Sequence, residues 1–288
     1  MTAATTTKLP AAVAAALGHP PRGERITIEA VGIPFSALTW GAPSDRPLLL
    51  IHGVTSSAAN WWRVGPALAA SGRRVVAVDL PGHGLTGHWV GHVRFRDNAA
   101  DVAAFARAAG LVHDDLQVIG HSWGAMTAAA LPVAGLRPAT LVLLDPPFLP
   151  LALISLEASD PHQRTYDDLD EAIAAITAAN PAWHPLDVRA RADALTHVDE
   201  AAARSVVLEN GDWDGGLADL ADPAAAGIPV WVVRGEQATG SYLLDAGLPA
   251  FEALIGKDHI ATIAGGPHSP QRTHPVETTA ALLHALGA

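Results

Sequence analysis

The sequence predicts an α/β fold: an eight-stranded, mostly parallel sheet flanked by helices, with an inserted helical cap. Three observations predict it. Short β-branched and leucine-rich runs alternate with longer alanine-rich segments of helical character, as in repeated βαβ units. The later short runs are almost wholly apolar, which is typical of strands that helices cover on both faces. Between Asp145 and Ile228, about eighty residues show helical patterns and no strand pattern.

Eight strands are expected, and the first two form a hairpin across Val31–Gly32. The expected strands are Glu24–Ala30, Ile33–Trp40, Leu48–Ile51, Val75–Asp79, Leu116–Ile119, Leu141–Asp145, Val230–Arg234 and His259–Ala264. The expected helices between and after them are Ala58–Ala70, Asp97–Ala109, Trp123–Val133, Ala246–Ile255 and Pro275–Leu286.

The chain is expected to divide into an N-terminal extension (1–23), a core (24–148 and 223–288) and a cap (149–222). Proline-rich turns stand where the cap leaves the sheet, at Pro146 to Pro150, and where it returns, near Asp222–Pro223. Helices are expected within the cap at Asp167–Ala179, Leu186–Leu195 and Glu200–Glu209.

Composition excludes several classes of function. The 288 residues can bury a large core without a disulfide or metal, and the chain has no cysteine for thiolate chemistry. The formal net charge of −11 disfavours nucleic-acid and anionic-membrane partners. The first residues lack the pattern of a signal peptide, and no apolar run is long enough to span a bilayer. We therefore expect a cytoplasmic protein without nucleic-acid or membrane partners; the sequence does not specify its oligomeric state.

The most specific motif is Gly120-His121-Ser122-Trp123-Gly124, which follows an expected strand and opens an expected helix. In a G-x-S-x-G turn the small glycines permit a strained backbone that presents the serine hydroxyl at the carboxyl edge of the sheet, at a helix N-terminus. Taken alone, the motif also fits a glycine-flanked turn without catalytic function.

The order of four motifs resembles that of the α/β-hydrolase family, from about Ile26 to the C-terminus. Besides the G-x-S-x-G turn, they are Leu50–Val54 (LIHGV) after the third strand, Asp79–Gly84 (DLPGHG) after the fourth, and Gly265–His268 (GGPH) after the eighth. The resemblance implies a serine esterase or lactonase with a helical lid.

By this resemblance Ser122 is the nucleophile, His268 the base, and the backbone amides of Val54 and Trp123 form the oxyanion hole. A serine hydroxyl is a weak nucleophile at neutral pH, so an imidazole must take its proton during attack and return it to the leaving group. Two preorganised amides would stabilise the oxyanion of the tetrahedral intermediate by about 3 kcal/mol each. Without the motif order, the favoured interpretation of His268, one of 14 histidines in the chain, would be a histidine on a surface loop.

The acid of the triad departs from the common family pattern. Relatives usually carry an aspartate three residues after the glycine that ends the seventh strand, where this chain has Ala238. Some members place the acid at the end of the sixth strand, and Asp145 stands there. Asp145 is the first choice, although the same residue serves only to bind loop amides in many relatives. Glu236, Asp245 or a dyad without an acid are the alternatives.

The expected substrate-binding residues belong to the oxyanion loop, the helix after it and the cap. They are His52, Gly53, Trp61, Trp62, Trp183 and Trp213. Tryptophans at these positions serve as often for core packing as for a pocket wall.

No cofactor or metal is expected. His83, His88 and His92 lie with Trp89 in one histidine-rich loop, but the loop has no carboxylate among these residues, and it is a poor candidate for a zinc site.

The predicted function is hydrolysis of a small carboxylic ester or lactone through an acyl-enzyme on Ser122. The turn carries no aspartate nucleophile of the kind that epoxide hydrolases and dehalogenases of this fold use. A peptidase is disfavoured because the oxyanion loop lacks an HGGPG-like sequence. Two alternatives stay open: C–C bond hydrolysis of vinylogous diketones, and a lactone-type ligand receptor with slow turnover.

Overall fold

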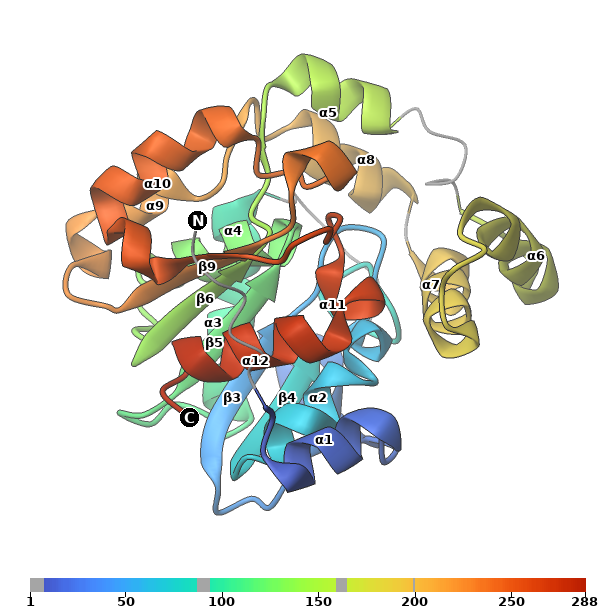
Figure 1. Ribbon diagram of the computed structural model, residues 1–288, viewed down its shortest axis with the longest axis horizontal. Helices are drawn as coiled ribbons and strands as arrows, with labels where there is room; N and C mark the ends of the chain where they lie inside the picture. Colours follow the sequence, from blue (N-terminus) through green and yellow to red (C-terminus); the bar gives the residue numbers. More distant parts are fainter. Residues whose placement is uncertain (1–7, 87–93, 159–164, 199) are drawn as a thin grey trace.

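The computed structural model describes residues 8–86, 94–158, 165–198 and 200–288. Its centre is an eight-stranded sheet, which confirms the predicted fold class (Figure 1). The order across the sheet is β1-β2-β4-β3-β5-β6-β9-β10; β1 and β4 both pair antiparallel to β2, and all other neighbours are parallel. The strands are β1 (Glu24–Ala30), β2 (Ile33–Trp40), β3 (Arg46–Ile51), β4 (Arg73–Val78), β5 (Gln117–His121), β6 (Thr140–Leu144), β9 (Val230–Arg234) and β10 (Ile260–Thr262).

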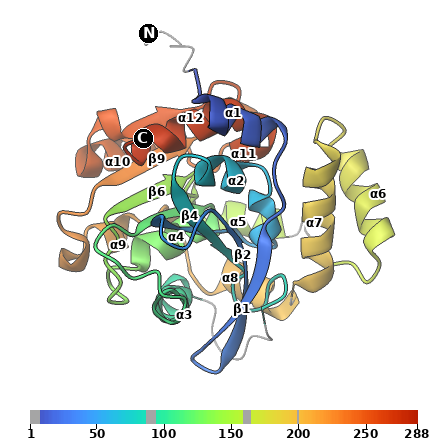
Figure 2. The same cartoon turned by 90° about the horizontal axis from the view of Figure 1, so that it is seen from below.

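Helices cover both faces of the sheet, as Figure 2 shows. One face is covered by α1 (Ala11–Gly18), α2 (Val64–Ala69) and α12 (Pro275–Ala285), and the other by α3 (Phe95–Ala108) and α4 (Trp123–Ala130), with α10 (Leu248–Ile255) beside them. Alternate residues of one strand serve the two cores: Leu48 and Leu50 pack on the first face, Leu49 and Ile51 on the second. This double burial explains why the central strands read as continuous apolar runs.

The helix α1 lies within the segment 1–23, where the sequence analysis did not predict a helix. Its Val13 and Leu17 are buried in the same cluster as α2 and α12. At least this part of the segment therefore contributes to the core.

The chain between β6 and β9 contains most of the helices that stand apart from the sheet. The helices of this segment are α5 (Leu151–Ala158), α6 (Leu169–Ala179), α7 (Pro185–His197), α8 (Glu200–Leu208) and α9 (Leu217–Leu220), and its two strands are β7 (Phe148–Leu149) and β8 (Trp213–Asp214). The helices α6 and α7 lie side by side at the right of Figure 1 and share a small apolar cluster of their own. That 149–222 forms a cap domain stays a prediction.

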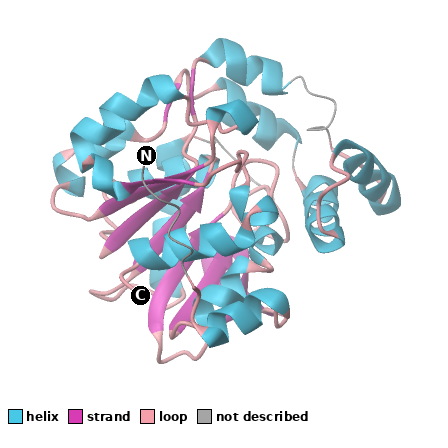
Figure 3. Ribbon diagram, in the orientation of Figure 1, coloured by secondary structure: helices cyan, strands magenta, loops and turns pink. Residues whose placement is uncertain are grey.

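The expectation that this segment has no strand was wrong in one respect. The strands β7 and β8 pair antiparallel, with Phe148 opposite Asp214 and Leu149 opposite Trp213. The two short strands are the magenta segments at the top of Figure 3. The sequence signal is weak because each strand has only two residues.

Proline interrupts or shortens two of the expected helices. The helix expected over Ala58–Ala70 divides into a 3₁₀ helix, η1 (Ala58–Trp61), and α2, because Pro66 lacks an amide hydrogen and its ring excludes a continuous helix from the preceding turn. Similarly, α4 ends at Ala130, two residues before Pro132. The remaining short helices are η3 (Pro223–Ala225), η4 (Gln237–Thr239), η5 (Asp245–Gly247), η6 (Lys257–His259) and α11 (Pro270–Thr273). Among the described helices, none combines the length and the apolar character that a bilayer span requires.

Candidate active site

Ser122 lies in the sharp turn between β5 and α4. Its backbone has φ 56° and ψ −124°, a conformation that L residues rarely adopt. The two motif glycines allow this turn. A Cβ on Gly120 would lie 2.0 Å from the carbonyl oxygen of Gly124, and a Cβ on Gly124 would lie 2.5 Å from the carbonyl oxygens of Ile51 and His52. The close packing of α4 on the end of β3 therefore requires glycine at both positions.

The hydroxyl of Ser122 is within hydrogen-bond distance of His268. Ser122 Oγ lies 2.8 Å from His268 Nε2, although the residues are 146 positions apart. His268 lies in the loop after β10, so the two residues come from the carboxyl ends of separate parallel strands. The ring of Tyr242 stacks on the imidazole, with centroids 3.9 Å apart and an interplanar angle of 21°. This contact and the bond to Ser122 fix the plane of the imidazole.

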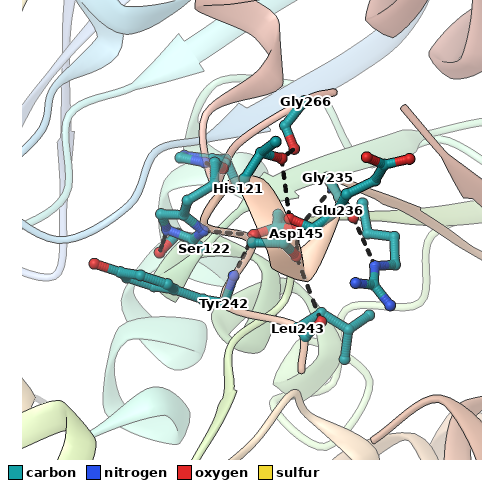
Figure 4. A network of polar contacts seen from close by, with 12 residues as sticks. His121, Ser122, Asp145, Gly235, Glu236, Tyr242, Leu243 and Gly266 are labelled. Carbon is teal, nitrogen blue, oxygen red and sulfur yellow. Dashed lines mark hydrogen bonds and ion pairs between the residues drawn. The ribbon is translucent and has the colours of Figure 1, made fainter. Parts of the chain in front are cut away.

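Asp145 follows β6, is fully buried, and accepts four hydrogen bonds (Figure 4). Its Oδ2 accepts from His268 Nδ1 at 2.6 Å and from Tyr242 N at 2.9 Å. Its Oδ1 accepts from Ser241 Oγ at 2.6 Å and from Gly235 N at 2.9 Å. Burial alone would raise the pKa of Asp145, but the hydrogen bonds and charge of His268, with the bonds from Ser241 and Gly235, hold it below its usual value. The site therefore favours a carboxylate at this position.

The alternative acids do not contact the imidazole. The Asp245 side chain is 66% exposed and pairs with Arg234 Nη1 at 2.8 Å. Glu236 donates its backbone amide to the carbonyl of Gly266, and no contact of its carboxylate with His268 is found in the described part of the chain. Ala238 lies exposed in η4. Of the carboxylates weighed from the sequence, Asp145 is the one that the structure places against His268.

The loop after β3 lies directly against the serine. A Cβ on Gly53 would lie 2.9 Å from Ser122 Cβ and 3.3 Å from Oγ, so a side chain there would crowd the hydroxyl. The next residues are Val54 and Thr55, and Thr55 has a left-handed φ of 53°. Trp123 is the first residue of α4, so no carbonyl of that helix accepts from its amide. The predicted oxyanion amides of Val54 and Trp123 thus belong to the two segments that flank Ser122.

His52, which was expected to bind substrate, is buried and supports this loop from within the core. Its ring is fully buried, Nδ1–H donates to the carbonyl of Gly53 at 2.7 Å, and Nε2 accepts from Leu80 N at 3.0 Å. Burial lowers the pKa of His52 to about 4, against a smaller opposing effect of the bond to Gly53. A neutral ring with both nitrogens engaged ties the loop to the end of β4.

Two of the four tryptophans expected at the pocket lie in the core of the structure. Trp61 is fully buried in the cluster that α1, α2 and α12 form beneath the sheet. Trp213 is 6% exposed and packs against the rings of Trp123 and Phe95 at 5.7 and 6.0 Å. In both positions the indole fills volume in a core.

The other two lie where α7 meets the core. Trp62 Nε1 donates to Asp187 Oδ1 at 2.8 Å, and the guanidinium carbon of Arg272 lies 4.5 Å from the centre of the Trp183 ring. Both indoles are half-buried. Their role in substrate binding stays a prediction.

Three residues that shape the site were not singled out from the sequence. Ser241 and Tyr242 supply two of the four donors to Asp145, from a loop with no recognisable motif. His121 is the variable residue of the G-x-S-x-G motif; its Nε2–H donates to the carbonyl of His268 at 2.9 Å. Burial, and then the charge of His268, lower the pKa of His121 to about 3, so the ring stays neutral and holds the His268 loop.

The histidine-rich loop lies largely outside the described residues, since these exclude His88, Trp89 and His92. His83 is described: it is 1% exposed, its Nδ1–H donates to the carbonyl of Pro81, and its ring packs 5.3 Å from that of His52. This residue is part of the core next to the oxyanion loop.

The chain is similar to known proteins over most of its length. The profile of the alpha/beta hydrolase family matches residues 48–282. The chain is 29% identical to Lipase LipV of Mycobacterium tuberculosis over 264 residues, which are 86% of this chain and 96% of LipV. It is 33% identical over 119 residues to a serine hydrolase-like protein of Dictyostelium discoideum, covering 38% of this chain and 32% of that protein.

Epoxide hydrolase B of M. tuberculosis is 33% identical over 135 residues, which are 44% of this chain and 37% of that enzyme. The chain thus spans about a third of two of these relatives and nearly the whole of LipV.

Solved structures show the same fold along the chain. E-2-(acetamidomethylene)succinate hydrolase has a TM-score of 0.76 at 20% identity, covering 92% of this chain and 100% of that chain. Esterase RhEst1 from Rhodococcus sp. ECU1013 has a TM-score of 0.69 at 22% identity, covering 92% and 98%. With the matched family profile and the Ser122 turn at the carboxyl edge of the sheet, these comparisons show that the chain belongs to the alpha/beta hydrolase family.

Proposed function

We propose that this hydrolase cleaves a small carboxylic ester or lactone through an acyl-enzyme formed on Ser122. The observation that carries the proposal is the 2.8 Å contact between Ser122 Oγ and His268 Nε2, with Asp145 2.6 Å from the other ring nitrogen. A lipase relative over nearly the whole chain supports the choice of an ester bond.

In the first half-reaction, Ser122 Oγ bonds to the carbonyl carbon while its proton passes to His268 Nε2. The carbonyl π-electrons move to the oxygen, which the amides of Val54 and Trp123 stabilise, each by about 3 kcal/mol. The bond to the alcohol oxygen then breaks, and that oxygen takes the proton from His268. In the second half-reaction water attacks the acyl-enzyme by the same path and releases the acid.

Asp145 favours this proton transfer by its charge and by its geometry. The imidazolium that forms during attack lies against a buried carboxylate whose remaining lone pairs are occupied by Ser241, Tyr242 and Gly235. Because these donors fix the carboxylate, Nδ1 keeps the proton and Nε2 stays free to accept from Ser122.

Epoxide hydrolysis is disfavoured although two epoxide hydrolases are among the relatives. Opening an epoxide in this fold requires a carboxylate nucleophile at the turn, and this chain has Ser122.

The C–C hydrolase and the receptor use the same serine and histidine, so turnover measurements separate them from the ester hydrolase. Rapid multiple turnover of simple esters is the expected result, and a single slow turnover with ligand-dependent stabilisation would favour the receptor.

The cytoplasmic location stays a prediction, which cell fractionation would test.

Labelling with a fluorophosphonate, followed by intact mass and peptide mapping, tests the proposal. We expect one adduct per chain on Ser122, no adduct in Ser122→Ala, and labelling slowed by at least a hundredfold in His268→Ala. The exposed His284, on α12, provides a matched control. In His284→Ala, Ser122 should be labelled at the wild-type rate. A folded wild-type protein that stays unlabelled at Ser122 would overturn the proposal.

A further inference from the structure

A group of polar side chains with unused hydrogen-bonding atoms lies beside the proposed active site. At its centre is Arg272 on α11, four residues after His268. Its Nε donates to Asn60 Oδ1 at 2.9 Å, and its guanidinium lies over the half-buried ring of Trp183. Arg272 thus joins the segment after His268, the helix η1 and the turn that precedes α7 (Pro185–His197).

Several atoms of this group have no partner within the described chain. The two terminal nitrogens of Arg272 make no hydrogen bond and no ion pair with any described residue. Asn60 is 5% exposed and Asp187 3% exposed, and Asn60 Nδ2 and Asp187 Oδ2 are both buried without a partner in the described residues. Buried polar atoms are paired in the great majority of cases, so a set of unpaired ones around one cation indicates a site for a polar ligand or for ordered water.

The unpaired atoms are mainly donors, and the local charge is positive. The guanidinium of Arg272 and the side-chain amide of Asn60 both offer N–H groups, while Asp187 Oδ1 is already occupied by Trp62. Two guanidiniums, those of Arg272 and Arg63, act electrostatically on the single carboxylate of Asp187, which leaves one positive charge in excess. This excess occurs in a chain with a net charge of −11. Burial lowers the pKa of Arg272 to about 10, against a smaller opposing effect of Asp187, so the group stays cationic at neutral pH.

Electrostatics and chain connectivity link the group to the residues around the nucleophile. Arg272 influences the electrostatics of His121, the residue before Ser122. Asn60 is six residues after Val54, in the short helix that continues the oxyanion loop. Trp183, two residues before α7, and Asp187 within α7 contact this part of the core, so the group lies where the segment 149–222 meets the core.

We propose that Arg272, with the Asn60 amide, binds a carboxylate of the substrate, so that the preferred substrates are esters or lactones bearing a second, free carboxylate. The inference rests on the proposed function and specifies its substrate class. A guanidinium presents parallel N–H groups that match the two oxygens of a carboxylate, and charge-assisted bonds of this kind are the strong ones. Asp187 limits the affinity, because its own charge competes with that of the substrate.

The test compares pairs of methyl esters that differ only in this group. The first member of each pair carries a free carboxylate: monomethyl succinate, monomethyl glutarate or monomethyl adipate. The second member is the same methyl ester with a primary amide in place of that carboxylate. Hydrolysis of both is followed in a pH-stat. The readout is the ratio of kcat/KM between acid and amide, because a general disturbance of the site lowers both values. For the best chain length we expect a ratio of at least ten in the wild type.

Two variants should move the ratio in opposite directions. Arg272→Met should lower it at least tenfold, because the cation and its N–H groups are lost. Asp187→Asn should raise it severalfold, because it removes the competing charge and keeps the carbonyl oxygen that accepts from Trp62. Arg74→Met serves as the matched control; its guanidinium bonds to the carbonyl of Ala109 on another part of the surface, and the ratio should be that of the wild type.

A ratio near one in the wild type for all three chain lengths, or a ratio unchanged in Arg272→Met, would overturn the inference. If Arg272→Met does not fold, Asp187→Asn decides alone, and an unchanged or lower ratio contradicts the subsite. Fluorophosphonate labelling separates this outcome from failure of the proposed function. A protein labelled on Ser122 with a ratio near one is a serine hydrolase without the carboxylate subsite, whereas an unlabelled Ser122 contradicts the function itself.

Discussion

Replacing Asp145 with asparagine removes one charge and keeps the shape of the side chain. Both oxygens of Asp145 accept two hydrogen bonds each, and two of the four donors are backbone amides. Whichever way the new amide group turns, its NH₂ faces a backbone N–H: that of Tyr242 in one orientation and that of Gly235 in the other. One buried amide is then left without an acceptor, which costs about 1–3 kcal/mol of folding free energy.

The expected loss of activity is larger than the loss of stability. At 2.6 Å and an effective dielectric constant of about 20, the attraction between Asp145 and a charged His268 is about 6 kcal/mol. This attraction exists only while the imidazole is protonated, so it lowers the barrier rather than the energy of the free enzyme. Since a neutral amide retains part of the hydrogen bond, we expect kcat to fall about 10³- to 10⁴-fold.

The assay is turnover of 4-nitrophenyl acetate together with the rate of fluorophosphonate labelling, on protein shown by urea unfolding to be folded. Asp245→Asn is the matched control, because that exposed carboxylate pairs with Arg234 and lies outside the network of Asp145; its activity should stay within twofold of the wild type. A folded Asp145→Asn protein with kcat within tenfold of the wild type would show that the carboxylate does not stabilise the imidazolium.

Three further predictions concern stability and pH. The pKa of His52 is about 4 in the folded protein and 6.5 in the unfolded chain, so the unfolded state binds more protons between these two pH values. The free energy of unfolding therefore falls as the pH falls through 6.5, and about 2 kcal/mol should be lost by pH 5. Urea unfolding should show a smaller pH dependence in His52→Gln. Gly124→Ala should cost at least about 2 kcal/mol, because its Cβ meets fixed carbonyl groups, whereas Gly18→Ala, with open space around it, should change the unfolding midpoint little. Ser241→Ala removes the hydroxyl that donates to Asp145 at 2.6 Å, and so raises the pKa of Asp145. As the solution is acidified, the variant should lose activity at a higher pH than the wild type. An acidic side of the pH–activity profile that does not shift would contradict this role of Ser241.

The proposed triad could be predicted because the motifs that resemble those of the α/β-hydrolase family stand at the carboxyl ends of expected parallel strands. Ser122, Asp145 and His268 follow β5, β6 and β10 directly or within one short loop, and parallel strands bring their carboxyl ends to one edge. A recognisable motif marks the serine and the histidine, and the end of an apolar run marks the aspartate.

The surroundings of the triad could not be predicted in the same way. Ser241 and Tyr242 belong to a loop whose contacts depend on how it folds back onto β6, and no local pattern records that path. Trp61 and Trp213 were assigned to the pocket because tryptophan suits a pocket and a core equally well. Only the packing of whole helices decides between the two, as the buried positions of both residues show.

The pairing of β7 with β8 bears on how freely this chain can change during evolution. Leu149 and Trp213 lie opposite each other in the pair, so residues 150–212 leave and rejoin the molecule at neighbouring points. The entropy of closing a loop depends only weakly on its length, so a longer or shorter excursion here would change the loop-closure entropy little. Its contacts with the core, such as the buried Ile154, Val206 and Val207, would have to be replaced. Phe148 also bonds through its amide to the carbonyl of Tyr242, next to the donors that hold Asp145. The two-residue ladder is therefore a fixed junction at which the segment of residues 150–212 begins and ends, next to the loop that holds Asp145.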